Sequence, residues 1–240
     1  MKELNLFIVT LLLLGNHVIL RSQDVKQYIN QGLKLHEEGN YEEAIKSFTK
    51  AAQQEPENTD ILYYRANARM ELEKYEEAIE DYTALLNKSP EYTDALFNRG
   101  NAYYEMEKYK KSIADFTEAI SIEEDFTEAY IVRGSAYFNI EDYKQALDDF
   151  SKAIIMQSAD ANLFYDRGNC NFMLGNYNDA VNDYKSAITL NNKESDYYFN
   201  KALSEFYLEQ YTEGCNDLKS ASALGDKQAE EYYLELCGAE

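Results

Sequence analysis

The stretch Thr93–Phe126 reads TDALFNRGNAYYEMEKYKKSIADFTEAISIEEDF, and its pattern recurs along the chain with a period of 34 residues. Six copies follow one another, and they begin at Val25, Thr59, Thr93, Thr127, Ala161 and Ser195. A fixed period of this length is typical of arrays in which each repeat is one supersecondary unit. We number the positions of each repeat 1 to 34 and call the copies the first to the sixth repeat.

Small and large residues recur at fixed positions of the repeat. Position 17 is Tyr in every copy, while positions 8 and 20 are always Gly, Ala or Ser. Positions 4, 8 and 11 share one helical face, and positions 17, 20, 24 and 27 share another. The pattern therefore predicts two helices that approach closely at the small residues, with large residues filling the space around that contact. Position 15, which is Gly or Glu, marks the turn between the helices.

These residues resemble the tetratricopeptide repeat (TPR), and the resemblance covers residues 25–228. It implies an all-α fold, an α-solenoid of six antiparallel helix pairs wound into a right-handed superhelix whose first helices line a concave face. The array then spans residues 24–226, with repeats at 25–58, 59–92, 93–126, 127–160, 161–194 and 195–228.

The C-terminal stretch 227–240 reads KQAEEYYLELCGAE. Its apolar residues have the spacing of one amphipathic helix. We expect this helix to cap the array, because the last repeat otherwise exposes an apolar face. The ending is also similar to that of TPR proteins of bacterial envelopes, of the Bacteroidetes type.

The N-terminal residues 1–23 read MKELNLFIVTLLLLGNHVILRSQ. The apolar run Leu6–Leu14 follows a positive charge at Lys2 and is too short for an ordinary membrane-spanning helix. The segment resembles a secretory signal peptide that is cut near Ser22 or Gln23. The alternative is an uncleaved anchor. In either case we expect an exported protein that is periplasmic, envelope-associated or secreted.

The composition excludes several classes of function. A formal net charge of −21 argues against nucleic-acid binding, because phosphate contacts need a basic patch. Beyond the leader the chain keeps one histidine, His36, so His-based metal sites and general bases are not expected. No phosphate-binding loop, HExxH or GxSxG motif occurs. We therefore expect no catalytic residues, no cofactor, no metal and no small-molecule substrate.

Opposite charges recur at positions 7 and 23. In a hairpin that turns near position 15 these two positions are equidistant from the turn and should face each other. The first repeat lacks both charges, as expected if they form a pair. The sequence predicts five structural ion pairs, Arg65–Asp81, Arg99–Asp115, Arg133–Asp149, Arg167–Asp183 and Lys201–Asp217.

The resemblance places positions 2, 5, 9, 12 and 13 on the concave face. There the chain has aromatic residues, an asparagine row and an acidic fringe, and these suit a peptide that carries basic and hydrophobic residues. The alternative is that the aromatic rings pack between neighbouring repeats. The predicted peptide-binding residues are Tyr63, Asn67, Phe97, Asn101, Tyr104, Phe138, Tyr165, Asn169 and Phe172.

Of the three cysteines, Cys215 and Cys237 are equidistant from the turn around Asp226. A hairpin there would bring them together, and an oxidising compartment would permit a disulfide. The alternative is two small buried apolar residues. We expect Cys170, at position 10, to be buried and inert.

The sequence thus favours a non-enzymatic interaction module or scaffold that binds a peptide or helix of a partner protein in the concave groove. The alternative is a structural spacer or assembly factor of the cell envelope that uses its outer face or its ends. Neither the partner nor the process follows from the residues.

Overall fold

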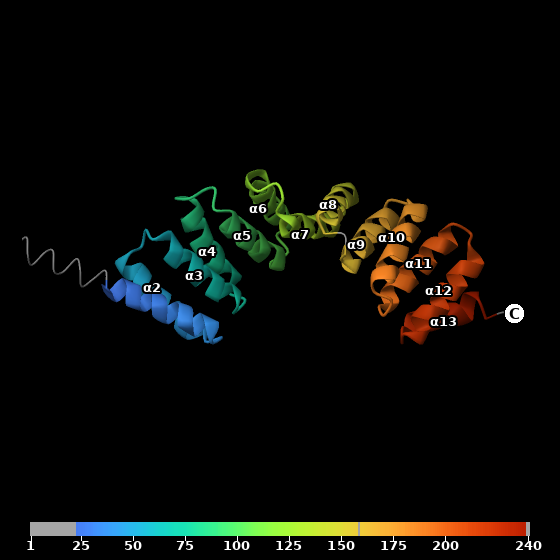
Figure 1. Ribbon diagram of the computed structural model, residues 1–240, viewed down its shortest axis with the longest axis horizontal. Helices are drawn as coiled ribbons and strands as arrows, with labels where there is room; N and C mark the ends of the chain where they lie inside the picture. The colour runs from blue at the N-terminus through green and yellow to red at the C-terminus, as the bar shows by residue number, and fades with distance from the viewer. Residues whose placement is uncertain (1–22, 158, 239–240) are drawn as a thin grey trace, which may run out of the picture. The chain divides into compact units, whose positions relative to one another are not determined.

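The computed structural model describes residues 23–157 and 159–238 (Figure 1). Apart from Gln23, the predicted signal peptide lies outside the described residues. Residues 23–37 are helical, and the helices that follow are α2 (Tyr41–Gln54), α3 (Thr59–Met70), α4 (Tyr75–Leu86), α5 (Thr93–Glu105), α6 (Tyr109–Ile122), α7 (Thr127–Asn139), α8 (Tyr143–Met156), α9 (Ala161–Met173), α10 (Tyr177–Leu190), α11 (Ser195–Tyr207), α12 (Tyr211–Ala223) and α13 (Lys227–Leu236). The described residues form no strand, which confirms the predicted all-α solenoid with a C-terminal helix.

The chain divides within α6 into two compact bodies. The N-terminal body ends at Lys111 and the C-terminal body starts at Ser112. In the first, α2, α3, α4 and α5 pack one on the next, and in the second the same holds from α7 to α13. Consecutive packing of this kind buries the apolar face of each helix against its neighbours in the chain.

The small residue at position 8 makes room for the large ring at position 24. A Cβ added to Gly32 would lie 2.5 Å from the ring of Phe48, and one added to Gly168 would lie 2.7 Å from Tyr184. Both rings are buried, so they have little room to move away. Close packing at this point explains why the repeat alternates small and large residues.

The turn between the two helices of a repeat falls at position 15, as predicted. Its φ angle is positive in four glutamates: Glu73 (57°), Glu107 (56°), Glu141 (64°) and Glu209 (62°). Gly39 and Gly175 adopt the same region at the same position, with φ of 75° and 79°. A residue with a Cβ is strained in this conformation, so the glutamates stand where glycine fits best.

The C-terminal helix α13 packs on α12. Its first turn is capped by Asp226, which accepts hydrogen bonds from the backbone N–H groups of Gln228 and Ala229 at 2.8 and 3.0 Å. Ala229 is buried, and Tyr233 packs against the core of the sixth repeat. This helix therefore covers the apolar end of the array.

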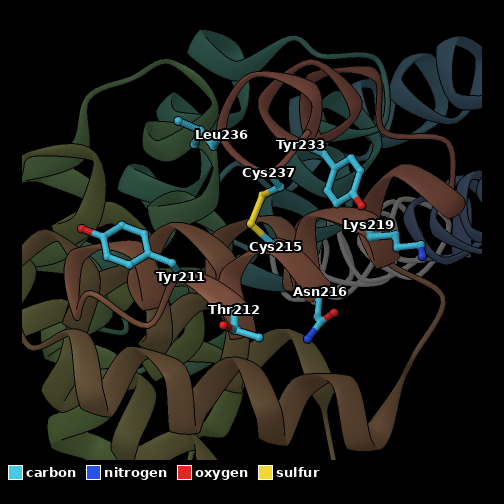
Figure 2. A pocket seen from close by; sticks show the side chains of 8 residues that line it. All are labelled: Tyr211, Thr212, Cys215, Asn216, Lys219, Tyr233, Leu236 and Cys237. Atoms are coloured by element: carbon cyan, nitrogen blue, oxygen red, sulfur yellow. A yellow bond between two sulfur atoms is a disulfide. The ribbon is translucent and has the colours of Figure 1, made fainter. Parts of the chain in front are cut away.

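A disulfide joins Cys215 on α12 to Cys237 at the end of α13, with Cα atoms 5.8 Å apart (Figure 2). A pocket of 410 Å³ lies beside the bond and is lined by both cysteines, with Tyr211 and Tyr233 among its other walls. The third cysteine, Cys170, is buried, and burial raises the pKa of its thiol to about 12. None of the described helices is long and apolar enough to cross a membrane.

Candidate functional site: the face of the first helices

All nine predicted peptide-binding residues lie on first helices and are partly buried. Tyr63 and Asn67 are on α3, Phe97, Asn101 and Tyr104 on α5, Phe138 on α7, and Tyr165, Asn169 and Phe172 on α9. The first five belong to the N-terminal body and the last four to the C-terminal body. Each body therefore presents its own set of candidate contacts.

Most of the predicted ion pairs are present within the bodies. They are Arg65–Asp81, Arg133–Asp149, Arg167–Asp183 and Lys201–Asp217. Burial opposes the charge of Arg133, but the hydrogen bond and the charge of Asp149 outweigh it and raise the pKa of Arg133. Arg99 and Asp115 lie on opposite sides of the division between the bodies, so that pair stays a prediction.

The arginines at position 7 also contact the preceding repeat. Their Nη1 atoms donate to threonine hydroxyls at position 25, from Arg65 to Thr49 at 3.4 Å, from Arg99 to Thr83 at 3.1 Å and from Arg133 to Thr117 at 3.1 Å. Sequence reasoning missed these contacts, although a threonine at position 25 in three successive repeats was the available signal. The arginines thus belong to the framework, and this leaves them unsuited to holding a ligand.

In the second, fifth and sixth repeats, position 11 carries a polar side chain that bonds to the ion pair between positions 7 and 23. Arg69 donates to Asp81 at 2.5 Å, and Asn171 donates to Asp183 at 2.9 Å. In the sixth repeat the group is Glu205, which is 2% exposed and accepts a hydrogen bond from Lys201 at 2.5 Å.

The Glu205 carboxylate has one oxygen, Oε2, without a hydrogen-bond partner. Lys201 also pairs with Asp217, so one cation faces two carboxylates in this partly buried cluster. Burial, together with the neighbouring Asp217, raises the pKa of Glu205 to about 7, although Lys201 opposes the shift.

A four-residue network of tyrosine and asparagine occurs once in each body. In the C-terminal body the Oδ1 atom of Asn169 accepts hydrogen bonds from the Tyr184 hydroxyl at 2.8 Å and from Asn200 Nδ2 at 3.1 Å. Asn200 also donates to the hydroxyl of Tyr165 at 3.0 Å. Hydrogen bonds from Asn169 and Asn200 partly offset the rise that burial causes in the pKa of Tyr165.

The same network recurs three repeats earlier, in the N-terminal body. There Tyr82 donates to Asn67 at 2.5 Å, and Asn98 donates to Asn67 at 3.2 Å and to Tyr63 at 3.4 Å. Burial raises the pKa of the Tyr82 hydroxyl, which stays protonated and acts as a donor. Two of the three asparagines in the predicted binding row thus use their carbonyl oxygens inside the fold.

Sequence reasoning missed four members of these networks, Tyr82, Asn98, Tyr184 and Asn200. A signal was present, because Tyr at position 24 occurs only in the second and fifth repeats, and each is followed by an Asn at position 6. Elsewhere position 24 is Phe or Leu, which cannot donate.

The aromatic residues at position 12 pack edge-on against the tyrosine at position 17 of their own repeat. The ring centroids are 5.4 Å apart for Tyr104 and Tyr109, and 5.2 Å apart for Phe138 and Tyr143. Phe172 and Tyr177 are 5.5 Å apart. These rings contribute to packing and retain only part of their surface for a ligand.

A pocket of 210 Å³ lies where α9, α10 and α11 meet. Its lining combines the amides of Asn169 and Asn200 with the side chains of Phe172, Met173 and Tyr184. Met173 is 50% exposed. The volume is below the usual range for a small-molecule site and suits one side chain of a larger ligand.

An exposed aromatic ring stands close to this pocket. Tyr207 at the end of α11 is 62% exposed, its centroid lies 5.5 Å from that of Phe172, and it stacks on Tyr177 at 4.5 Å. Sequence reasoning did not select Met173 or Tyr207, which stand at position 13, where the first three repeats have glutamate. The pocket, Met173 and Tyr207 together form what we call the α9–α11 site.

One carboxylate on α9 lacks a partner. Asp166 forms no hydrogen bond or ion pair with any residue that the structure describes. Burial, and next the charge of Asp160, raise its pKa to about 6. Among the described residues, no cluster of His, Cys, Asp and Glu side chains could hold a metal ion.

The chain is similar to tetratricopeptide repeats over most of the array. Protein-family models described as tetratricopeptide repeat match residues 35–80, 93–126, 127–159 and 161–193. A further family model, described as TPR repeat, matches residues 66–107. A comparison with curated protein sequences finds no significant match.

Solved structures with the same fold are numerous. One is YrrB, described as a TPR protein with an unusual peptide-binding site, with 20% identity, a TM-score of 0.72, and coverage of 79% of this chain and 98% of that one. The MamA protein has 20% identity and a TM-score of 0.69, with 73% and 96% covered. A tetratricopeptide repeat protein from Parabacteroides merdae has 25% identity and a TM-score of 0.59, with 88% and 83% covered.

Proposed function

Because the chain belongs to the tetratricopeptide repeat family, we propose that it is a non-enzymatic interaction module that binds a peptide segment or helix of a partner protein on its first helices. The observation that carries the proposal is the α9–α11 site. It combines a pocket for one side chain with exposed apolar surface at Met173 and Tyr207. A pocket flanked by exposed apolar side chains suits a peptide segment that inserts one side chain and lays the next across the rings.

Acidic groups define the charge of the preferred partner. The formal net charge of −21 disfavours acidic partners and increases the rate of association with basic ones. The pocket is too small for a drug-sized ligand, which favours a macromolecule that inserts one side chain. We therefore propose a protein partner with a basic and hydrophobic segment.

Site-specific photo-crosslinking tests this function. A benzophenone amino acid replaces Met173 in the full chain, and a matched variant carries it at Ile155, which is 79% exposed on α8. We expect a discrete crosslinked partner from position 173 in the cells that produce the protein, and none from position 155. The double substitution of Met173 and Tyr207 by glutamate should abolish capture without loss of helicity. Equal crosslinking from both positions would refute the assignment of the α9–α11 site.

A second candidate function rests on the end of the array. Leu234 and Leu236 on α13 are 66% and 53% exposed, so the capping helix leaves apolar surface for assembly with another component. In a structural spacer, Leu234→Glu with Leu236→Glu would disrupt the assembly while the Met173 and Tyr207 substitutions had no effect. The reverse result favours the peptide-binding module.

We also propose that the protein is exported. The support is the N-terminal segment, whose short apolar run follows a positive charge. Fractionation of the cells and N-terminal sequencing of the mature protein test this. A mature chain that starts near Gln23 is expected, and recovery of a full-length chain from the cytoplasm contradicts export.

A further inference from the structure

On α9, neither packing nor the hydrogen-bond networks account for the carboxylate of Asp166. We propose that its carboxylate is the anchor for a Lys or Arg side chain of the bound peptide. The inference rests on the proposed function and adds the chemical class of residue that the site selects. The α9–α11 site then receives a hydrophobic residue of the same peptide.

The repeat shows what Asp166 replaces. It stands at position 6, where Asn98 and Asn200 donate their amide hydrogens to the preceding repeat. An ionised carboxylate has no hydrogen to donate. The preceding repeat also differs, because Ile131 and Ser135 stand where the networks have Tyr and Asn, and the Ser135 hydroxyl donates to the Ile131 carbonyl at 3.1 Å. Asp166 therefore cannot make the hydrogen bonds that Asn98 and Asn200 make to the preceding repeat.

The buried carboxylates Asp81, Asp149 and Asp183 have cationic partners, and the partly buried Asp166 has none among the described residues. Asp81, Asp149 and Asp183 are all buried, and each is paired with an arginine at position 7 of its own repeat. The arginine closest to Asp166 in sequence, Arg167, is committed to Asp183 at 2.5 Å. Since a partly buried carboxylate is stabilised by a cationic partner, an external cation at Asp166 would supply the compensation that the other carboxylates already have.

The groups whose pKa values are coupled to the charge of Asp166 become anions or stay neutral. They are Asp160, Tyr165 and Cys170 on its own side, Tyr184 on α10 and Tyr197 on α11. Tyr197 is itself occupied, because its hydroxyl donates to Asn162 at 2.7 Å. No cation is among the causes of the raised pKa of Asp166, so the site is complementary to a cation that comes from outside.

A metal ion is a poor candidate for that cation, because the described residues offer no cluster of ligands. A Lys or Arg side chain needs only one carboxylate and forms a charge-assisted hydrogen bond with it. Asp166 and Met173 lie on the same helix, about 10 Å apart along its axis at 1.5 Å per residue. An extended peptide spans that distance in about three residues. The site therefore selects a basic residue close in sequence to a large hydrophobic one.

Selection from random peptides tests the anchor. Short N-acetylated peptides, which lack a free terminal ammonium, are selected for binding to the full chain. We expect Lys or Arg at one fixed position near a hydrophobic residue. Replacing that basic residue by norleucine should weaken binding at least about tenfold, the usual effect of losing a hydrogen bond to a charged group. Binding should also weaken below about pH 6, where Asp166 becomes protonated.

Two matched variants separate the anchor from general electrostatics. Asp166→Asn introduces the residue of the third and sixth repeats, so the fold is expected to be retained, and it should bind the Lys and norleucine peptides equally. Asp148→Asn removes the same charge from an exposed position on α8 and should behave like the natural chain.

The outcomes distinguish this inference from the proposed function. If peptides are selected but show no fixed basic position, or if Asp166→Asn keeps the preference for lysine, the anchor is wrong and the binding module stands. If the full chain selects no peptide at all, both proposals fail. If Asp148→Asn also loses the preference for lysine over norleucine, the preference comes from the net charge of the chain, and the anchor is wrong.

Discussion

The guanidinium of Arg133 on α7 donates two parallel hydrogen bonds to the carboxylate of Asp149 on α8, from Nε at 2.8 Å and from Nη2 at 2.7 Å. The two side chains are only 14% and 6% exposed. Removing one partner leaves the other charge desolvated and unpaired, so Arg133→Ala should lower the free energy of unfolding by about 3 kcal/mol. Urea denaturation measures this loss.

The control for this ion pair is a double-mutant cycle. Asp149→Asn combined with Arg133→Ala should cost less than the sum of the single changes, because no unpaired charge then remains. Since the pair is internal, Arg133→Ala should reduce stability more than it reduces partner binding. A variant that is as stable as the natural chain but has lost its partner would contradict the structural role.

The tyrosine–asparagine networks should contribute to stability. Tyr184→Phe removes the hydroxyl that donates to Asn169 and should destabilise the protein by about 1 kcal/mol. The reverse change at the matched position of the preceding repeat, Phe150→Tyr, buries a hydroxyl where Ser135 replaces the asparagine and should cost more. Thermal melts of the two variants compare them directly. A neutral Tyr184→Phe would show that the network adds nothing to stability.

The glutamates at position 15 should be suboptimal. Glu141 has φ of 64°, a region that glycine adopts without steric cost. Glu141→Gly should therefore raise the free energy of unfolding by roughly 0.5 to 1 kcal/mol. Gly175→Ala makes the opposite change at the same repeat position. A Cβ there would meet nothing within 4 Å, so any loss of stability comes from the backbone conformation and not from a steric clash. Stabilisation by Gly175→Ala would disprove the account.

The buried Glu205 should make stability depend on pH. Its pKa is raised to about 7 in the folded protein, above the ordinary glutamate value of 4.5. Between these values the folded state binds more protons than the unfolded state, so this group makes stability fall as pH rises from about 4.5 to about 7. The contribution is on the order of 2 to 3 kcal/mol.

Glu205→Gln tests that dependence. Gln keeps an acceptor for Lys201 but does not titrate, so the variant should lose part of the decline between pH 5 and 8 and gain stability at pH 8. Urea denaturation of both proteins at each pH isolates Glu205 from the repulsion of the other charges. Identical pH profiles would show that Glu205 is ionised throughout this range.

The disulfide should stabilise the capping helix. Cys215 and Cys237 are separated by 22 residues, and closing a loop of this size contributes about 3 kcal/mol. In Cys237→Ser, we expect faster hydrogen exchange of the amides of α13, while α9 and α10 stay protected. Unchanged exchange in α13 would mean that Ala229 and Tyr233 hold the helix without the bond.

Local patterns predicted most of the architecture. The spacing of Gly100, Tyr109, Ser112 and Ala119 in Thr93–Phe126, repeated along the chain, indicated both helices, the turn at position 15 and the opposition of positions 7 and 23. These features depend on neighbours within one repeat, for which helical periodicity is a sufficient guide.

The candidate site was only partly predictable. Asn67 and Asn169 were selected for their residue type, but their carbonyl oxygens accept hydrogen bonds from Tyr82 and Tyr184, respectively, inside the fold. Tyr207 was not selected, although it is exposed beside Phe172. Which polar atoms remain for a ligand depends on contacts between repeats, and a single repeat does not reveal these contacts.

The sequence by itself therefore determined the repeat, the helix pairs, the positions of the charge pairs and the family, because each follows from a spacing of a few turns of helix. Only the tertiary structure decided which side chains are already occupied. It joined Asn200 to the preceding repeat and left Asp166, at the same repeat position, without a partner among the residues that the structure describes. The physical reason is that a hydrogen bond needs a donor and an acceptor at close range, and packing of separate repeats sets that distance.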